Sequence, residues 1–187
     1  MKFILKSLSS YVALWLVAVA MAFALAVAAP NEASIMGRLP DFMLPTLTHR
    51  PMAVPGGLPS DRTLALITFQ RGQRAQADSW ITGLNLNNDS SISWMRMPVL
   101  SDPGTAGGRA AAENRLMQNY PDAGQRAKLV PVFTDRADFV RAAGLGGVQN
   151  FYAVVINRQG DVLARVEGEF DANKAQLLRE TLQTGGF

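Results

Sequence analysis

The chain has 187 residues and a formal net charge of +3 at neutral pH. It contains no cysteine, which excludes disulfide bonds, thiol redox chemistry, thiolate nucleophiles and cysteine metal sites. It has one histidine, His49, so clusters of two or more histidine ligands are excluded as well. Lys2 and Lys6 supply two of the three net positive charges, so the rest of the chain is nearly neutral. We therefore expect no nucleic-acid partner, and we expect no bound cofactor.

The first residues have the pattern of a targeting sequence. Lys2 and Lys6 precede an uncharged apolar run over residues 11–29, and Ala26 and Ala28 are the small residues that a cut after Ala28 requires. Residues 1–28 are therefore predicted to be a signal peptide. The alternative is an uncleaved anchor, because a bilayer span takes about 20 apolar residues. Both alternatives predict an exported, periplasmic protein, either soluble or in contact with the inner membrane through residues 11–29.

Two further regions follow the leader. Residues 29–60 are rich in proline, which fixes its own backbone angle and favours extended geometry in the residue before it. We expect an irregular arm with short extended pieces. Residues 61–187 are predicted to form the folded domain, and the length that remains after cleavage suits one domain with a sizeable core.

The first half of this domain shows two strands and two helices. Residues 62–69 form an apolar, partly β-branched run that is typical of a buried parallel strand. A helix follows, because Ala77, Trp80, Ile81 and Leu84 share one helical face. Residues 92–100 are predicted to be a second strand, with Pro98 as its candidate end. A helix over residues 108–120 stops at the next proline.

The second half adds three strands and two helices. Residues 128–133 form a short strand whose proline indicates an edge position. Thr134 or Asp135 can cap the next helix, and Gly144 can end it. A hairpin is predicted from residues 151–156 and 162–166, and a helix begins at Asp171. The order β-α-β-α-β-α-β-β-α predicts an α/β fold with a mostly parallel sheet, helices on both faces and an antiparallel edge.

Two segments resemble the thioredoxin-like superfamily in its peroxiredoxin-type arrangement: residues 39–47 are similar to its opening arm, and residues 151–160 to its late strand and hairpin turn. The resemblance covers residues 39–182 and implies a central mixed sheet flanked by helices. The redox cysteines of such proteins would fall near Arg74 and Ala77, and the facing cis-proline near Phe151. Because none of these is present, the chain is not expected to be a thiol oxidoreductase or peroxidase.

A narrower resemblance concerns residues 68–72, 78–80 and 154–160, with Gly168 beyond them. They are similar to segments of the assembly-factor family for the membrane sector of mitochondrial ATP synthase. This resemblance implies a chaperone-like role and a membrane-complex subunit as the protein partner. The predicted export signal departs from the mitochondrial setting of that family.

The candidate binding residues lie at the first strand-to-helix junction. Arg71 and Arg74 stand where a helix start disfavours cations, so a bound carboxylate or phosphate would reverse the balance, and Gly72 would allow close approach. Phe151 is expected to lie on the same face. In the alternative interpretation, the arginines point to water or pair with the carboxylates that follow the hairpin, Glu167 and Glu169.

Other chemically capable residues are weaker candidates. Catalysis by His49 would need a serine and a carboxylate placed by the fold, and no Gly-x-Ser-x-Gly motif occurs. Asp135 and Asp138 offer too few oxygen ligands for calcium. We therefore expect a redox-inactive, exported interaction or assembly module. A small-anion-binding carrier or sensor is the alternative, and a cysteine-independent enzyme using His49 or paired carboxylates is less favoured.

Overall fold

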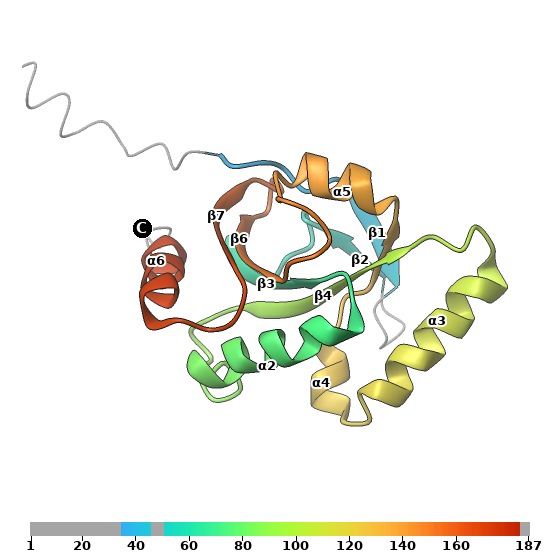
Figure 1. Ribbon diagram of the computed structural model, residues 1–187, viewed down its shortest axis with the longest axis horizontal. Helices are drawn as coiled ribbons and strands as arrows, with labels where there is room; N and C mark the ends of the chain where they lie inside the picture. Colours follow the sequence, from blue (N-terminus) through green and yellow to red (C-terminus); the bar gives the residue numbers. More distant parts are fainter. Residues whose placement is uncertain (1–34, 46–50, 184–187) are drawn as a thin grey trace, which may run out of the picture. The chain divides into compact units, whose positions relative to one another are not determined.

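The computed structural model describes residues 35–45 and 51–183, and its centre is a five-stranded sheet in the order β5-β4-β3-β6-β7. The predicted leader and His49 lie outside the described residues. Parallel pairing joins the first three strands of that order, and antiparallel pairing joins the rest (Figure 1). The strands are β3 (Arg62–Thr68), β4 (Trp94–Ser101), β5 (Val132–Thr134), β6 (Tyr152–Asn157) and β7 (Val162–Glu167).

The expectation of a mostly parallel sheet is wrong, because β6 runs antiparallel to β3 in the middle of the sheet. The antiparallel edge is confirmed, since the edge strand β7 pairs antiparallel with β6, and so is the central mixed sheet flanked by helices. Tyr152, at the start of β6, pairs with Ile67 near the end of β3. The chain therefore enters β6 at the end of the sheet where β3 leaves it. The sheet is mixed, and β5 is at an edge as predicted.

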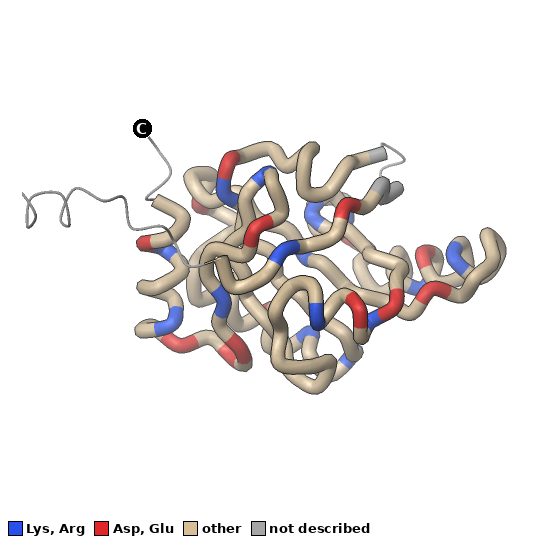
Figure 2. Tube along the Cα trace, turned by 90° about the horizontal axis from the view of Figure 1, so that it is seen from above, with Lys and Arg blue, Asp and Glu red and all other residues tan. Residues whose placement is uncertain are grey.

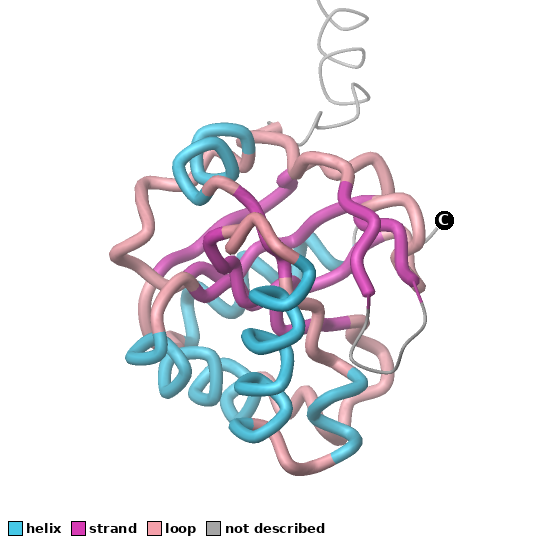
Figure 3. The backbone as a smooth tube through the Cα atoms, turned by 90° about the vertical axis from the view of Figure 1, so that its right-hand side faces the viewer, coloured by secondary structure: helices cyan, strands magenta, loops and turns pink. Residues whose placement is uncertain are grey.

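Helices cover both faces of this sheet, so that the strands lie between them (Figures 1 and 3). Asp135 rather than Thr134 caps α5, because its side chain accepts a hydrogen bond from the backbone N–H of Asp138. The short α4 was not predicted; it is capped by Asp122 in the same manner. The helical elements are η1 (Arg71–Gln73), α2 (Arg74–Gly83), α3 (Ala106–Asn119), α4 (Ala123–Ala127), α5 (Arg136–Ala142) and α6 (Ala172–Gln183).

Two hydrophobic clusters fill the space between sheet and helices. Successive residues of β3 point to opposite faces, and both faces are buried, which explains its nearly continuous apolar sequence. Leu64 and Leu66 pack in the cluster that contains Trp80 of α2. Ala65 and Ile67 belong to the cluster on the other face, which contains Phe139 of α5 and Leu39 of the arm.

The proline-rich arm contributes to this second cluster. Its short extended pieces are β1 (Phe42–Pro45) and β2 (Pro51–Val54), which form an antiparallel pair. Leu39, Val54 and Leu58 are buried in the core. The expected short extended pieces are therefore present, and the described part of the arm packs into the core.

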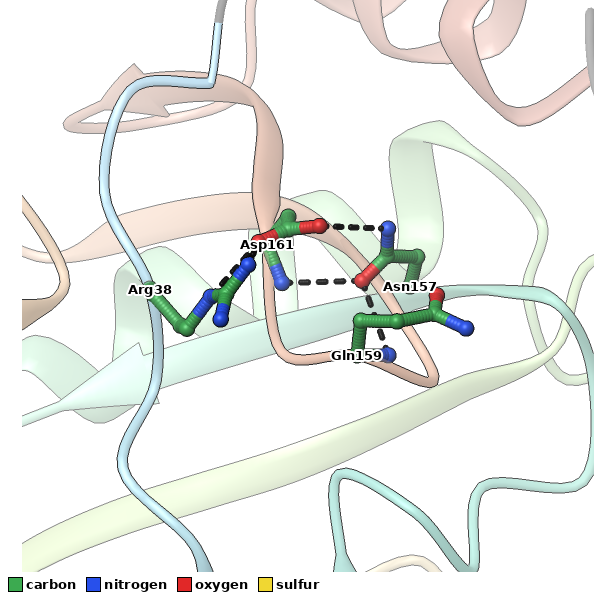
Figure 4. A network of polar contacts seen from close by, with 4 residues as sticks. All are labelled: Arg38, Asn157, Gln159 and Asp161. Carbon is green, nitrogen blue, oxygen red and sulfur yellow. Dashed lines mark hydrogen bonds and ion pairs between the residues drawn. The ribbon is translucent and has the colours of Figure 1, made fainter.

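A polar network fastens the arm to the turn between β6 and β7 (Figure 4). The Arg38 guanidinium donates from Nε to Oδ1 of Asp161 at 2.8 Å, and Nδ2 of Asn157 donates to Oδ2 at 3.1 Å. The hydrogen bond from Asn157, followed by the hydrogen bond and charge of Arg38, lowers the pKa of the Asp161 carboxyl below its ordinary value. Asp161 is buried, at 7% exposure. Arg38 and Asn157 hold its carboxylate in place from two sides.

Pro98 does not end β4, contrary to the sequence-based expectation. It is buried within the strand, pairs in register with Thr68 of β3, and β4 continues to Ser101. Arg96 exchanges backbone hydrogen bonds with Lys128 and Val130, and pairing with β5 resumes at the residue after the proline. β4 therefore tolerates the backbone N–H that Pro98 lacks, because β4 makes hydrogen bonds to the neighbouring segment both before and after this residue.

Within residues 35–45 and 51–183, no helix is both long and apolar enough to cross a membrane. Figure 2 shows that Lys and Arg are interspersed with Asp and Glu along the described trace. A strongly charged site therefore requires that the fold bring side chains of one sign together. The arginines of the strand-to-helix junction are the residues to examine for such a site.

Candidate functional site

The junction between β3 and α2 is held by a side chain that the sequence analysis did not single out. Gln73 is buried, and its Oε1 accepts hydrogen bonds from the backbone N–H groups of Phe69 at 2.6 Å and Gln70 at 3.2 Å. Its Nε2 donates to the carbonyl oxygen of Val148 at 3.1 Å. Gln73 therefore joins the end of β3 to the loop that precedes β6, and it fixes the backbone from which Arg71 and Arg74 project.

A cavity of about 440 Å³ lies beside this junction, at the carboxyl ends of β3 and β4. We call it the arginine pocket, because Arg71, Arg74 and Arg136 line it and, among the described residues, no acidic residue does. Four apolar side chains supply much of the remaining lining: Phe69, Pro98, Leu100 and Leu116. The carboxyl ends of parallel strands are where α/β folds commonly bind ligands.

The three arginines differ in how many of their hydrogen-bond donors already have a partner within the protein. Arg74 donates from Nη1 to the Asn119 carbonyl at 2.9 Å, and its guanidinium lies 4.3 Å from the centre of the Tyr120 ring. Within the described residues, the exposed side chain of Arg71 makes no hydrogen bond or ion pair. Arg136 is the first residue of α5, and its Nε is buried without a partner. Arg71 and Arg136 therefore have donors left for a ligand.

An ion pair links α2, whose Arg74 lines the pocket, to β4 of the sheet. Arg96 of β4 is 7% exposed and donates to Oδ1 of Asp78 of α2 at 2.5 Å. The other carboxylate oxygen of Asp78 lies 3.9 Å from Nε of Arg74. Asp78 thus compensates Arg74 and Arg96, and it leaves Arg71 and Arg136 uncompensated.

The structure separates the four residues that the sequence analysis proposed for binding. Arg71 and Arg74 line one pocket, and neither pairs with Glu167 or Glu169 in the described residues. Gly72 is exposed beside them, with no atom within 4 Å of the position that a side chain would take. Phe151 is fully buried in the cluster between the sheet and α2, so its side chain lies in the core and not on the predicted face.

Arg136 is the residue of this site that sequence reasoning missed. The sequence could have indicated it, because a cation is unfavourable in the first turn of any helix. Arg136 follows the cap residue Asp135 and so has the same unfavourable position as the arginines at the junction of β3 and α2. What the sequence could not show is that α5 begins beside that junction. The fold brings Arg136 to the same pocket across more than 60 positions of sequence.

Three of the carboxylates noted in the sequence have structural partners. Asp135 caps α5, and Asp138 pairs with Arg141 at 3.0 Å. Glu167 accepts a hydrogen bond from Asn150 at 3.2 Å. Among residues 35–45 and 51–183, no three His, Cys, Asp or Glu side chains gather in a way that could hold a metal ion.

No model of a known protein family matches the sequence, and no curated protein does. Several solved structures, however, are similar to this chain. One is BsSco, a member of the Sco family of cytochrome c oxidase assembly proteins, at 12% identity and a TM-score of 0.54 over 80% of this chain and 95% of that one. A second is a putative electron transfer protein from Aquifex aeolicus VF5, at 13% identity and a TM-score of 0.56 over 80% and 97%.

A third is Etrx1, an exposed lipoprotein thioredoxin from Streptococcus pneumoniae strain TIGR4, at 14% identity and a TM-score of 0.50 over 78% of this chain and 99% of that one. None of these comparisons shows the link to ATP synthase assembly factors. What they share with the chain is the sheet and its flanking helices, over nearly their whole length. The chain therefore has a thioredoxin-like fold, built from a sequence that contains no cysteine.

Proposed function

We propose that the protein is a redox-inactive, exported interaction module that assists the assembly of a partner protein, and that the arginine pocket contacts this partner. One observation carries the proposal. The strand-to-helix junction at which the resemblance places redox cysteines borders instead a pocket lined by Arg71, Arg74 and Arg136 and by no carboxylate. The chain has lost the chemistry of that edge and has a charged binding surface there.

The assembly role is supported by fold precedent. BsSco, which shares the fold, belongs to a family of cytochrome c oxidase assembly proteins. A shared fold does not carry a function by itself, so the proposal depends on the pocket. The relation to BsSco supports the type of role, which is assembly. The leader pattern supports export, since an uncharged apolar run follows Lys2 and Lys6.

The charge of the pocket indicates the kind of partner. Guanidinium groups recognise carboxylates through paired N–H donors, and they do so most strongly where water is partly excluded. Complementary charge also steers association and discriminates between partners. We expect the contacting segment of the partner to be negatively charged where it meets Arg71 and Arg136.

The proposal is tested by photo-crosslinking in the native host. The full chain, tagged at its carboxyl end, carries benzoylphenylalanine in place of Leu116, which lines the pocket, or of Leu177, which is exposed on α6. We expect one partner to be cross-linked through position 116 and not through 177, and mass spectrometry to identify it as a subunit of a membrane complex. Equal cross-linking from both positions would contradict the proposal.

Charge reversal provides the second arm of this experiment. The double change Arg71→Glu, Arg136→Glu should abolish the cross-link through position 116, because it turns two positive groups of the pocket negative. Arg115→Glu is the matched control, since Arg115 is exposed on α3 and does not line the pocket. Amino-terminal sequencing of the purified protein tests the leader, with Ala29 as the expected first residue after cleavage.

A second function, a carrier or sensor of small organic anions, is favoured by the size of the pocket. About 440 Å³ lies within the roughly 300–1,000 Å³ that ligand pockets occupy. This function predicts that a small carboxylate raises the thermal midpoint of the protein and that the double charge reversal removes the effect. The absence of any cross-linked protein together with such a shift would favour the carrier.

A further inference from the structure

The geometry of the arginine pocket points to a more specific ligand: we propose that it binds the carboxyl-terminal residue of the partner polypeptide. The terminal carboxylate lies between Arg71 and Arg136, and the apolar side chain of the same residue packs on Phe69, Leu100 and Leu116. This inference rests on the proposed function and names the part of the partner that is recognised.

The first argument concerns donors that the protein leaves unused. Within the described residues the Arg136 side chain makes no hydrogen bond or ion pair, and its buried Nε without a partner is energetically costly. Arg71, on the neighbouring junction, makes no hydrogen bond or ion pair with any described side chain. Arg74 differs, because Asn119, Asp78 and Tyr120 already engage it. Two guanidinium groups therefore remain, and one carboxylate has enough oxygen lone pairs for both.

The second argument concerns the rest of the lining. Phe69, Pro98, Leu100 and Leu116 line the pocket, and the partly exposed Leu100 and Leu116 present apolar surface next to the arginines. Phosphate or another fully hydrated anion would satisfy the guanidinium groups and leave this surface in contact with water. A ligand that combines a carboxylate with an apolar group covers both parts of the lining.

The third argument concerns how close the two parts of the ligand must be. The pocket is small, at about 440 Å³, so the carboxylate and the apolar group have to enter it together. In the last residue of a polypeptide both groups branch from one carbon atom, and a single length of chain leads away from them. An internal Asp or Glu has no apolar group beyond its carboxylate, and its backbone continues in two directions. Capture of a terminal carboxylate is one of the recurring modes of peptide recognition.

The test measures binding of two fluorescein-labelled peptide pools to the full chain in mild detergent. Both pools have the sequence Gly-Ser-Gly-Ser-X, where X is an equal mixture of Leu, Ile, Val, Met and Phe. One pool ends in a free carboxylate and the other in a carboxamide. By fluorescence polarisation we expect the carboxylate pool to bind at least tenfold more tightly, and equal binding of the two pools would overturn the inference.

Variants locate the effect in the pocket. Arg136→Gln and Arg71→Gln should each weaken binding of the carboxylate pool about tenfold and leave binding of the carboxamide pool unchanged. Arg115→Gln, on α3, should change neither. Far-ultraviolet circular dichroism checks the fold of each variant. If Arg136→Gln does not fold, Arg71→Gln decides, because the Arg71 side chain is exposed and has no partner to lose.

The remaining outcomes separate this inference from the proposed function. If 4-methylpentanoate competes as tightly as the peptide pool binds, the ligand is a small carboxylic acid and a polypeptide terminus is not what is recognised. If neither pool binds while the arginine-dependent cross-link through position 116 persists, the partner is held by another part of its chain. In that case the inference is overturned and the proposed function stands.

Discussion

Oε1 of Gln73 accepts a hydrogen bond from the backbone N–H of Phe69 across 2.6 Å, so a side chain of η1 completes the end of β3. The same amide reaches the Val148 carbonyl at 3.1 Å. One buried polar side chain therefore contacts both the end of β3 and the loop that precedes β6. We therefore expect the stability of the protein to depend on the Gln73 side chain.

Gln73→Ala should lower the free energy of unfolding by about 1–3 kcal/mol, because it leaves the buried N–H of Phe69 without an acceptor. Equilibrium unfolding in urea measures the loss. Gln118→Ala is the control, since Gln118 is exposed on α3 and surface changes of this kind stay within about 0.5 kcal/mol. Similar losses in the two variants would show that the Gln73 contacts do not stabilise the junction.

The pair of Asp78 and Arg96 should respond asymmetrically to substitution. Asp78→Ala leaves the buried guanidinium of Arg96 without its carboxylate, which we expect to cost about 1–3 kcal/mol, below the range for fully buried pairs because Asp78 is half exposed. Arg96→Met removes the charge and also the two Arg96 nitrogens that already lack partners, so it should cost less than about 1 kcal/mol. Urea unfolding of both variants checks this order, and a larger loss in Arg96→Met would contradict it.

Gly160 should not tolerate a side chain. Its φ is +85°, and a Cβ atom there would lie 2.8 Å from the Leu39 carbonyl oxygen and 2.9 Å from Cγ of Pro55. We expect Gly160→Ala to destabilise the fold by about 1–3 kcal/mol, since a non-glycine residue is strained in this region. Gly56→Ala is the matched control, because no atom lies within 4 Å of its Cβ position and its φ is not positive. Thermal unfolding should separate the two variants clearly.

The pKa of Asp161 predicts how stability depends on acidity. Because the folded pKa is lowered, the contribution of this carboxylate is present above the ordinary carboxyl pKa of about 4 and is lost as the pH falls towards the folded value. Asp161→Asn should therefore be less stable than the unaltered protein at pH 7, and the gap should narrow below about pH 4. Thermal midpoints across this range measure it, and a constant gap would mean that the charge of Asp161 does not contribute.

The sequence predicted the elements that have strong local signals. β3 is an apolar run bounded by polar residues, and the hairpin of β6 and β7 surrounds a turn whose residues favour it, so both were found nearly at their observed bounds. α4 was missed because it has five residues, none of them buried, and so no apolar periodicity. The position of β6 beside β3 was also missed, since strand pairing depends on contacts across the whole chain.

The site was predicted only in part, for the same reason. Arg71 and Arg74 could be proposed because helix-end electrostatics is a local property of the sequence. The contribution of Arg136 depends on where α5 begins in space, and that of Gln73 on a carbonyl 75 residues away. Phe151 was expected on the same face as the arginines by analogy with the cis-proline position of the superfamily, whereas an apolar aromatic directly before β6 is more stable in the core.

The contact between Arg38 and Asp161 spans 123 residues and constrains the order in which the protein can fold. The arm is synthesised before its partner, the turn between β6 and β7. Closing a loop of this length has an entropic cost that must be met before the contact contributes, so arm docking is expected late. Until then Leu39, Val54 and Leu58 have no core to enter. Docking of the arm is therefore expected only after β6 and β7 have been made.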